Sequence, residues 1–159
     1  MYRTLATLVL IALAGTSSGA SELSPPFTIL EGRHAQELAR QCSRAGPPGF
    51  QSTWQPSERD IKELEARLSL LEKLKASLCC IKGARVKDVH KYYRQYVGIV
   101  VNGRKLVYIN ALAISSERRF ASEWKSEPVM VCDGGTEFWG AIYDPATKTF
   151  SQLAFNGVA

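Results

Sequence analysis

Three carboxylates near the C-terminus of the sequence could form a hydrolytic pair or a calcium site. They are Asp133, Glu137 and Asp144, and both aspartates stand next to glycine or proline. Asp is also favoured in turns, because its side chain accepts hydrogen bonds from nearby backbone N–H groups. A regular strand between two such turns holds Asp133 and Asp144 far apart, since each residue advances the chain by about 3.3 Å. The pattern therefore favours turns over a catalytic pair or a metal site.

His90 is a further candidate for acid–base catalysis, although a weak one, and His34 is weaker still. His90 stands beside Lys91 and Tyr92, just before a stretch with the composition of β-strands, and imidazole takes up a proton near neutral pH. A histidine on the surface is the commoner case. The sequence has no CxxC, HExxH, P-loop or GxGxxG pattern, which are usual signatures of metal, phosphate and dinucleotide sites. We therefore expect no metal and no cofactor, and favour a protein that is not an enzyme.

Four cysteines are candidates for disulfide bonds: Cys42, Cys79, Cys80 and Cys132. Four cysteines allow three pairings. A bond between neighbours in the chain is strained, so we expect Cys42 and Cys132 each to pair with one of the two adjacent cysteines. The sequence leaves open which of these two pairings forms.

The first 20 residues have the pattern of a secretory signal peptide. Arg3 supplies the positive charge, Leu5 to Ala14 is almost entirely apolar, and the small residues Ser18 and Ala20 precede the expected cleavage site. The apolar run is too short to span a bilayer, although an N-terminal membrane anchor is the alternative. We expect a periplasmic or secreted protein, cleaved near Ala20 and without a membrane-spanning segment afterwards. Disulfides are stable in such compartments.

The chain carries a formal net charge of +5 at pH 7, with 20 Lys and Arg residues against 15 Asp and Glu residues. The basic residues fall in several short groups, such as Arg104-Lys105 and Arg118-Arg119. This excess is only a weak electrostatic signal, and nucleic acid is not the expected target outside the cytoplasm. An acidic protein partner or an anionic surface fits the charge better.

The secondary structure that must position the candidate residues is predicted to begin with an N-terminal segment and a helix. Residues 21–56 are predicted to form a leader and a short helix at Glu31–Cys42. Ser57 and Asp60 then form a capping-box pattern, and Leu or Ile recurs every three or four residues up to Leu78. This spacing predicts one amphipathic helix of about six turns. Its apolar stripe would cover one face of a sheet, with a dimer seam as the alternative.

Residues Tyr92 to Leu112 predict a β-hairpin. Two strand-like runs flank Asn102-Gly103, and this pair favours a two-residue turn in which both positions have positive φ. The turn sets the register, so that Gln95 lies opposite Asn110. Both faces of the hairpin are largely apolar, so we expect it to be central and covered on both sides.

Three further strands are predicted after the hairpin, at Val129–Cys132, Thr136–Tyr143 and Phe150–Phe155. A break in the apolar alternation near Ser151-Gln152 predicts a β-bulge in the last one. Together these patterns predict an α+β fold, in which one long amphipathic helix packs on an antiparallel sheet of about five strands, with a short N-terminal helix. Residues 57–159 would form this domain as one unit with the segment before them.

Four aromatic side chains are the candidates for binding residues: Trp54, Trp124, Trp139 and Tyr143. Trp and Tyr often dominate protein–protein binding, although each of these can equally belong to the core, which is the expectation for Trp139. We expect a module that binds another protein in the cell envelope or outside the cell, as inhibitors and immunity proteins do. A small envelope hydrolase, or a protein that binds a small molecule or a glycan, is the alternative.

The blocks YYRQYVGIVVNG, LVYINAL and VCDGGTEFWGAIYDPATKTFSQLAFNG resemble a family of small exported proteobacterial proteins of unknown function. The similarity covers most of the chain after Trp54, and it implies no activity or catalytic residue. The expected helix and sheet also resemble the cystatin-like architecture. The cystatin motif Gln-x-Val-x-Gly is not matched at Gln95-Tyr96-Val97-Gly98-Ile99, because the glycine comes one position early and the stretch lies inside a predicted strand.

Overall fold

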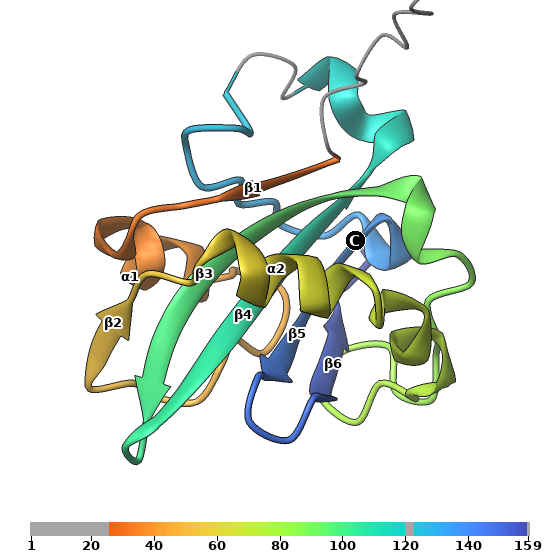
Figure 1. Cartoon of the computed structure of the whole chain (residues 1–159). Helices are drawn as coiled ribbons and strands as arrows, with labels where there is room; N and C mark the ends of the chain where they lie inside the picture. Colours follow the sequence, from red (N-terminus) through yellow and green to blue (C-terminus); the bar gives the residue numbers. More distant parts are fainter. Residues whose placement is uncertain (1–25, 120–122, 159) are drawn as a thin grey trace, which may run out of the picture.

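The computed structural model describes residues 26–119 and 123–158, and a mixed sheet of six strands forms its centre (Figure 1). The strands in sheet order are β1 (Phe27–Ile29), β3 (Tyr92–Val101), β4 (Arg104–Ala113), β5 (Phe138–Asp144) and β6 (Thr149–Phe155). A further strand, β2 (Ser52–Trp54), pairs with β3 beside β1. β1 runs parallel to β3, and the other pairs are antiparallel.

The predicted α+β fold, with one long helix on an antiparallel sheet of about five strands, is therefore wrong, because the described residues form mostly sheet and only short helices. Two strands of three residues each, β1 and β2, come from residues 21–56, where the sequence predicted a leader and a short helix. The sheet is mixed because β1 runs parallel to β3. The predicted signal peptide, residues 1–20, lies outside the described residues.

The hairpin of β3 and β4 has the predicted turn and register. Asn102 and Gly103 have φ values of 49° and 75°, as this kind of turn requires. Gln95 lies opposite Asn110, and most of both strands is buried. The hairpin is central and covered on both faces, as predicted.

The long helix predicted from Ser57 to Leu78 is wrong. The chain forms α2 (Glu58–Glu65), which has eight residues, and then the 3-10 helix η2 (Leu68–Lys73). The capping box of Ser57 and Asp60 is present at the start of α2. The apolar stripe is buried against the sheet as expected, but two short helices carry it in place of one long helix. Its buried residues are Ile61, Leu64, Leu68 and Leu71.

Spacing and tertiary pairing explain why the helix stops. Leu68, Leu71 and Leu74 follow one another at intervals of three residues, which matches the three residues per turn of a 3-10 helix. Leu74 is extended, and the N–H of Ala76 donates to the carbonyl of Ala84 at 2.8 Å. A continuous helix through this region would not allow that pairing.

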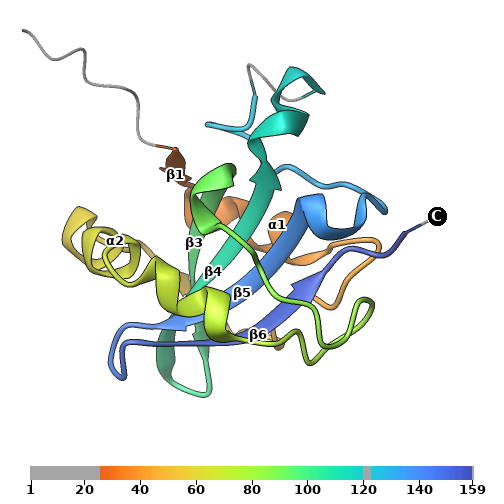
Figure 2. The ribbon, with the colours of Figure 1, turned by 90° about the vertical axis from the view of Figure 1, so that its right-hand side faces the viewer.

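The N-terminal segment covers the opposite face of the sheet from α2 (Figure 2). The 3-10 helix η1 (Gly32–His34) leads into α1 (Ala35–Ala39), so the helical part is shorter than the predicted Glu31–Cys42. Leu38 is fully buried in the cluster that includes Val97 and Ile99 of β3. The sheet therefore has two separate apolar faces.

The predicted strand at Val129–Cys132 is also wrong, because side-chain amides take its hydrogen bonds in place of a neighbouring strand. Asn110 Nδ2 donates to the carbonyl of Val129 at 2.8 Å, and Asn156 Nδ2 donates to the carbonyl of Val131 at 2.7 Å. The irregular segment then enters the 3-10 helix η5 (Gly135–Glu137) before β5.

The last two strands follow the prediction closely. The β5–β6 register shifts between Gly140 and Ile142, and Gln152 has a φ of 53°, which confirms the bulge. Two more 3-10 helices flank the hairpin, η3 (Val89–Lys91) before β3 and η4 (Ile114–Arg119) after β4.

Candidate functional site

Three of the four predicted binding residues are buried in the core. Trp124, Trp139 and Tyr143 are 2%, 0% and 1% exposed. Trp124 stacks on Tyr93 with 4.6 Å between ring centroids, and Tyr143 packs on Phe150 at 4.9 Å. These three side chains hold the sheet and its covering segments together, which is the alternative that the sequence left open for them.

Trp54 is the predicted binding residue that reaches the surface. It is half-buried at the end of β2 and lines a recess of about 590 Å³ that opens to solvent. Figure 1 shows the tip of the β3–β4 hairpin and the β5–β6 turn at the same end of the sheet, and the recess lies there beside the start of α2. The residues that line it are Trp54, Asp60, Gly103, Arg104, Lys105, Asp144, Pro145 and Ala146.

Contacts on β3 and β4 hold Trp54 in this position. Its indole Nε1 donates to the carbonyl of Leu106 at 2.9 Å, and Lys105 Nζ lies 5.3 Å from the ring centroid. Gly98 lies opposite Trp54 in the sheet, and a Cβ at Gly98 would come within 2.1 Å of the Trp54 carbonyl oxygen. This close approach of β2 requires glycine. The aromatic ring is therefore held in place before any ligand binds.

Arg104 and Asp144 form an ion pair at the edge of the recess, with side chains 63% and 8% exposed. Asp144 Oδ1 also accepts from the backbone N–H of Ala146 at 2.9 Å. Burial raises the pKa of the Asp144 carboxyl, but the Ala146 amide, the Arg104 guanidinium and Thr147 together lower it by more, so that this pKa lies below its ordinary value. The carboxylate is ionised at neutral pH and holds Arg104 beside Trp54.

Replacing Asp144 by asparagine is expected to lower stability at neutral pH and to remove part of its acid dependence. Because the folded pKa is depressed, the contribution of Asp144 is fully present above the ordinary carboxyl pKa of about 4 and is lost as the pH falls through the lower folded value. We expect Asp144→Asn to lower the free energy of unfolding by about 1 kcal/mol at pH 7, since Arg104 is solvent-screened. Urea denaturation across the acid range measures this difference, which should shrink as the pH falls; a constant difference would contradict the assignment.

The three predicted carboxylates do not come together. Asp144 lies in the Trp54 recess, at the end of β5. Glu137 accepts a hydrogen bond from Ser116 Oγ at 2.7 Å, and Asp133 precedes η5, before the start of β5. Asp144 begins the turn that follows β5, as its sequence context predicted, whereas Asp133 lies in irregular backbone before η5.

His90 is exposed and does not join these carboxylates. Its backbone N–H donates to Asp88 Oδ1 at 3.0 Å. A neighbouring recess of about 400 Å³ includes Tyr92 and Glu137 but not His90. Among the side chains that the structure describes, no three His, Cys, Asp or Glu residues gather in a way that could hold a metal ion.

The disulfides are Cys42–Cys132 and Cys79–Cys80. The expectation that Cys42 and Cys132 would each pair with one of the adjacent cysteines is therefore wrong. The Cα atoms of Cys42 and Cys132 lie 5.3 Å apart, a normal separation for a disulfide. A network of buried polar side chains holds the two segments side by side.

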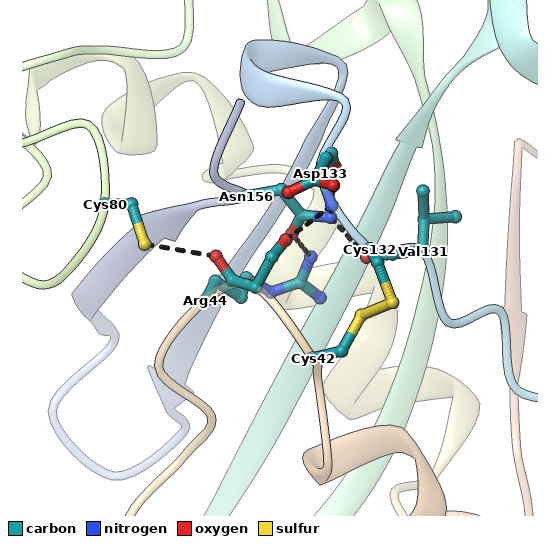
Figure 3. Close-up of a disulfide and its surroundings, with 8 residues drawn as sticks. Cys42, Arg44, Cys80, Val131, Cys132, Asp133 and Asn156 are labelled. Atoms are coloured by element: carbon teal, nitrogen blue, oxygen red, sulfur yellow. Dashed lines mark hydrogen bonds between the residues drawn. A yellow bond between two sulfur atoms is a disulfide. The ribbon is translucent and has the colours of Figure 1, made fainter. Parts of the chain in front are cut away.

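Arg44 lies at the centre of this network (Figure 3). It is 5% exposed, and it donates from Nη1 to Asn156 Oδ1 at 2.6 Å and from Nη2 to Asn110 Oδ1 and Tyr108 Oη. Its Nε is buried without a partner, and among the described residues no carboxylate forms an ion pair with it. The guanidinium is thus held by neutral groups only.

The amides of the network bind the irregular segment that carries Cys132. Asn156 Nδ2 donates to the carbonyls of Val131 and Asp133 at 2.7 and 2.8 Å (Figure 3). Gln95 Nε2 donates to the carbonyls of Trp124 and Glu127, both at 2.6 Å. The network therefore joins the segments of both half-cystines to the sheet.

Arg44, Asn110 and Asn156 were not among the functional residues predicted from the sequence. A signal for Asn110 was present, because a polar side chain in the apolar run LVYINAL needs a hydrogen-bonding partner when it is buried. Arg44 stands before a Gly-Pro-rich stretch and has no periodic pattern that marks it as buried.

In the part of the chain that the structure describes, no helix has the length and apolar character that crossing a membrane requires. Comparison with protein families, with curated proteins and with solved structures finds no match to this chain.

Proposed function

We propose that this chain is an exported binding protein that recognises another protein through the recess at Trp54. The observation that carries the proposal is Trp54 itself, a half-buried aromatic ring held by the Leu106 carbonyl and by Lys105 at the edge of an open recess. Trp and Arg are enriched among the residues that dominate protein–protein binding. A side chain that is already ordered loses little conformational entropy when a partner binds.

The charges around the recess indicate the chemistry of the partner. Arg104 and Lys105 are exposed, while Asp144 is buried and its carboxylate is occupied by Arg104 and backbone N–H groups. Asp60, the other acid of the lining, is partly buried, and its Oδ2 accepts from the N–H and the hydroxyl of Ser57. The exposed charged side chains of the recess are therefore the two basic ones. The partner segment that fits best carries a carboxylate next to an apolar or aromatic side chain.

Two features support export. The N-terminal sequence has the composition of a signal peptide, and the Cys42–Cys132 disulfide is of a kind that persists in oxidising compartments. We therefore place the protein in the periplasm or outside the cell, where its partner would also be found.

Affinity capture followed by a binding measurement tests the proposal. The oxidised protein is immobilised and incubated with envelope and culture extracts, and a partner bound in stoichiometric amount is purified. Calorimetry then compares the wild type with Trp54→Ala and Lys105→Glu. Loss of a central Trp commonly costs 2 kcal/mol or more, so we expect affinity to fall by about 30-fold for Trp54→Ala.

Leu70→Ala is the matched control, because Leu70 is a large apolar residue on η2 that is 40% exposed and lies outside the recess. It should bind like the wild type. Lys105→Glu reverses an exposed charge, and it keeps the test informative if Trp54→Ala loses stability. Equal affinity for the wild type, Trp54→Ala and Lys105→Glu would refute binding through this recess.

A further inference from the structure

The two adjacent cysteines lie in an exposed and strongly basic loop, away from the lining of the Trp54 recess. We call residues 73–91 the basic loop. It contains six Lys and Arg residues and one acidic residue, Asp88. The basic side chains, all exposed, are Lys73, Lys75, Lys82, Arg85, Lys87 and Lys91. Cys79 and Cys80 are exposed as well, so that solutes can reach their sulfur atoms.

The loop is anchored, so a folded structure presents the disulfide. Ala76, Val86 and Val89 are buried in the main core cluster. The N–H of Ala76 donates to the carbonyl of Ala84 at 2.8 Å, and the N–H of Gly83 donates to the carbonyl of Ala76 at 2.9 Å. Cys79 and Cys80 therefore lie within a closed turn on the protein surface.

The positive charge of the loop is largely unneutralised. Asp88 pairs with Lys91 at 3.9 Å. Among the side chains that the structure describes, those of residues 26–116 and 123–158, no carboxylate lies within 4.0 Å of the other five basic groups of the loop. Nearby cations raise the local concentration of anions and stabilise a thiolate relative to a thiol. The loop thus favours both the approach of an anionic thiol and the release of a cysteine thiolate.

The fold protects the two disulfides to different extents. Cys42–Cys132 joins residues 90 positions apart, and a bond between such distant segments stabilises the folded state. By thermodynamic linkage, the folded state stabilises that bond to the same extent. Cys79–Cys80 joins neighbours and closes no long loop, so it has no such protection. The adjacent pair is therefore the one that a thiol should reduce first.

We propose that the Cys79–Cys80 disulfide is a thiol–disulfide exchange site that takes electrons from anionic thiols. The incoming thiolate attacks Cys79 Sγ and forms a mixed disulfide with it, while the Cys79–Cys80 bond breaks and leaves its electron pair on Cys80 Sγ. The attack falls on Cys79 because the Ser43 carbonyl oxygen lies 3.2 Å from Cys80 Sγ, and its partial negative charge repels a thiolate that approaches that sulfur (Figure 3).

The remaining steps complete the exchange. The Cys80 thiolate takes a proton from solvent, and its S–H then donates to the Ser43 carbonyl, a hydrogen bond that the oxidised sulfur lacks the proton to make. A second thiolate attacks the sulfur of the bound thiol and releases the Cys79 thiolate. In total, two thiols become one disulfide, and the two electrons reduce Cys79–Cys80 to a pair of cysteines.

Timed alkylation with glutathione as the probe tests the proposal. The oxidised protein is mixed with reduced glutathione, quenched with a thiol-alkylating reagent at intervals, and digested for mass spectrometry. We expect Cys79 and Cys80 to become alkylated at least about tenfold faster than Cys42 and Cys132, with the glutathione adduct on Cys79. Circular dichroism should stay native while only the adjacent pair is reduced.

Comparing a cationic thiol with an anionic one tests whether the charge of the basic loop selects anionic thiols. Cysteamine is a cationic thiol, and its rate per thiolate is measured beside that of the anionic glutathione. The ratio of the two rates should fall several-fold in a Lys82→Glu, Arg85→Glu variant and at high salt. Reduction of both disulfides together, or of Cys42–Cys132 first, would overturn the exchange site. An unchanged ratio in the charge-reversed variant would overturn its selectivity for anionic thiols.

Discussion

Replacing Glu65 by alanine is expected to lower the free energy of unfolding by about 3–5 kcal/mol. Arg94 is 0% exposed, and Glu65 accepts from its Nε and Nη2 in two hydrogen bonds of 3.0 Å each. Removal of the carboxylate leaves the guanidinium charge buried between α2 and β3 without a counter-charge. A buried, unpaired charge is among the most costly defects in a folded protein. Urea denaturation of the two proteins at neutral pH measures the difference.

Tyr96 adds to the effect, because it shares the same carboxylate. Its hydroxyl donates to Glu65 Oε1 and accepts from Arg94 Nε. Burial, and then the negative charge of Glu65, raise the pKa of Tyr96 well above its ordinary value. The phenol therefore keeps its proton and remains a donor, and in the Glu65→Ala protein this buried donor also loses its acceptor.

Glu63→Ala is the matched control on the same helix. Glu63 pairs with Lys148 and Arg67 at the surface, where such pairs contribute little, so its denaturation midpoint should stay near that of the wild type. Glu65→Gln keeps hydrogen-bonding atoms but loses the charge, and it should lie between the wild type and Glu65→Ala. If Glu65→Ala were as stable as Glu63→Ala, the ion pair with Arg94 would not be a main support of α2.

Replacing Asn156 by alanine is expected to lower the free energy of unfolding by about 3 kcal/mol or more. Asn156 is 0% exposed, and three groups lose their hydrogen bond with it: Arg44 Nη1 and the carbonyls of Val131 and Asp133. Each buried group that is left without a partner costs about 1–3 kcal/mol. Because the side chain is neutral, no relief of a buried charge offsets this loss.

Gln41→Ala is the control for Asn156→Ala. Gln41 is an amide of similar chemistry, but it donates only to the carbonyl of Leu38, in a partly buried bond of 2.9 Å, so its loss should cost about 1 kcal/mol. A second measurement is the rate at which glutathione reduces Cys42–Cys132, which should rise in Asn156→Ala, because the network keeps Cys132 beside Cys42. A variant with wild-type stability and wild-type reduction rate would show that the network does not perform this task.

The elements that the sequence predicted well depend on local interactions. The Asn102-Gly103 turn needs two residues that tolerate positive φ, and the register of β3 with β4 follows from that turn. The capping box at Ser57, and the turn with Asp144 at its start, each involve groups within three residues of one another. The neighbours of Trp54 in its recess belong to these same turns, so that part of the candidate site could be expected piece by piece.

The elements that the sequence predicted wrongly depend on partners that are distant in the chain. The helix after Ser57 ends early because Ala76 pairs with Ala84 and the leucine stripe follows the sheet. The strand predicted at Val129–Cys132 is replaced by irregular backbone, because the amides of Asn110 and Asn156 satisfy it. Neither outcome can be derived from the sequence of the segment alone, because the residues of the first segment fit a helix and those of the second fit a strand.

By itself, the amino-acid sequence determined the hairpin, the capped start of α2, the turn after β5 and the bulge, because each is a local balance of backbone freedom and short-range hydrogen bonds. Only the tertiary structure decided which aromatic rings are buried, which cysteines pair, and where Arg44 and Arg94 find their partners. Those partners lie as far as 112 positions away in the case of Arg44 and Asn156, and 29 positions away in the case of Arg94 and Glu65. Burial makes these polar contacts necessary. A buried polar group without a partner costs more free energy than the same hydrogen bond contributes at the surface.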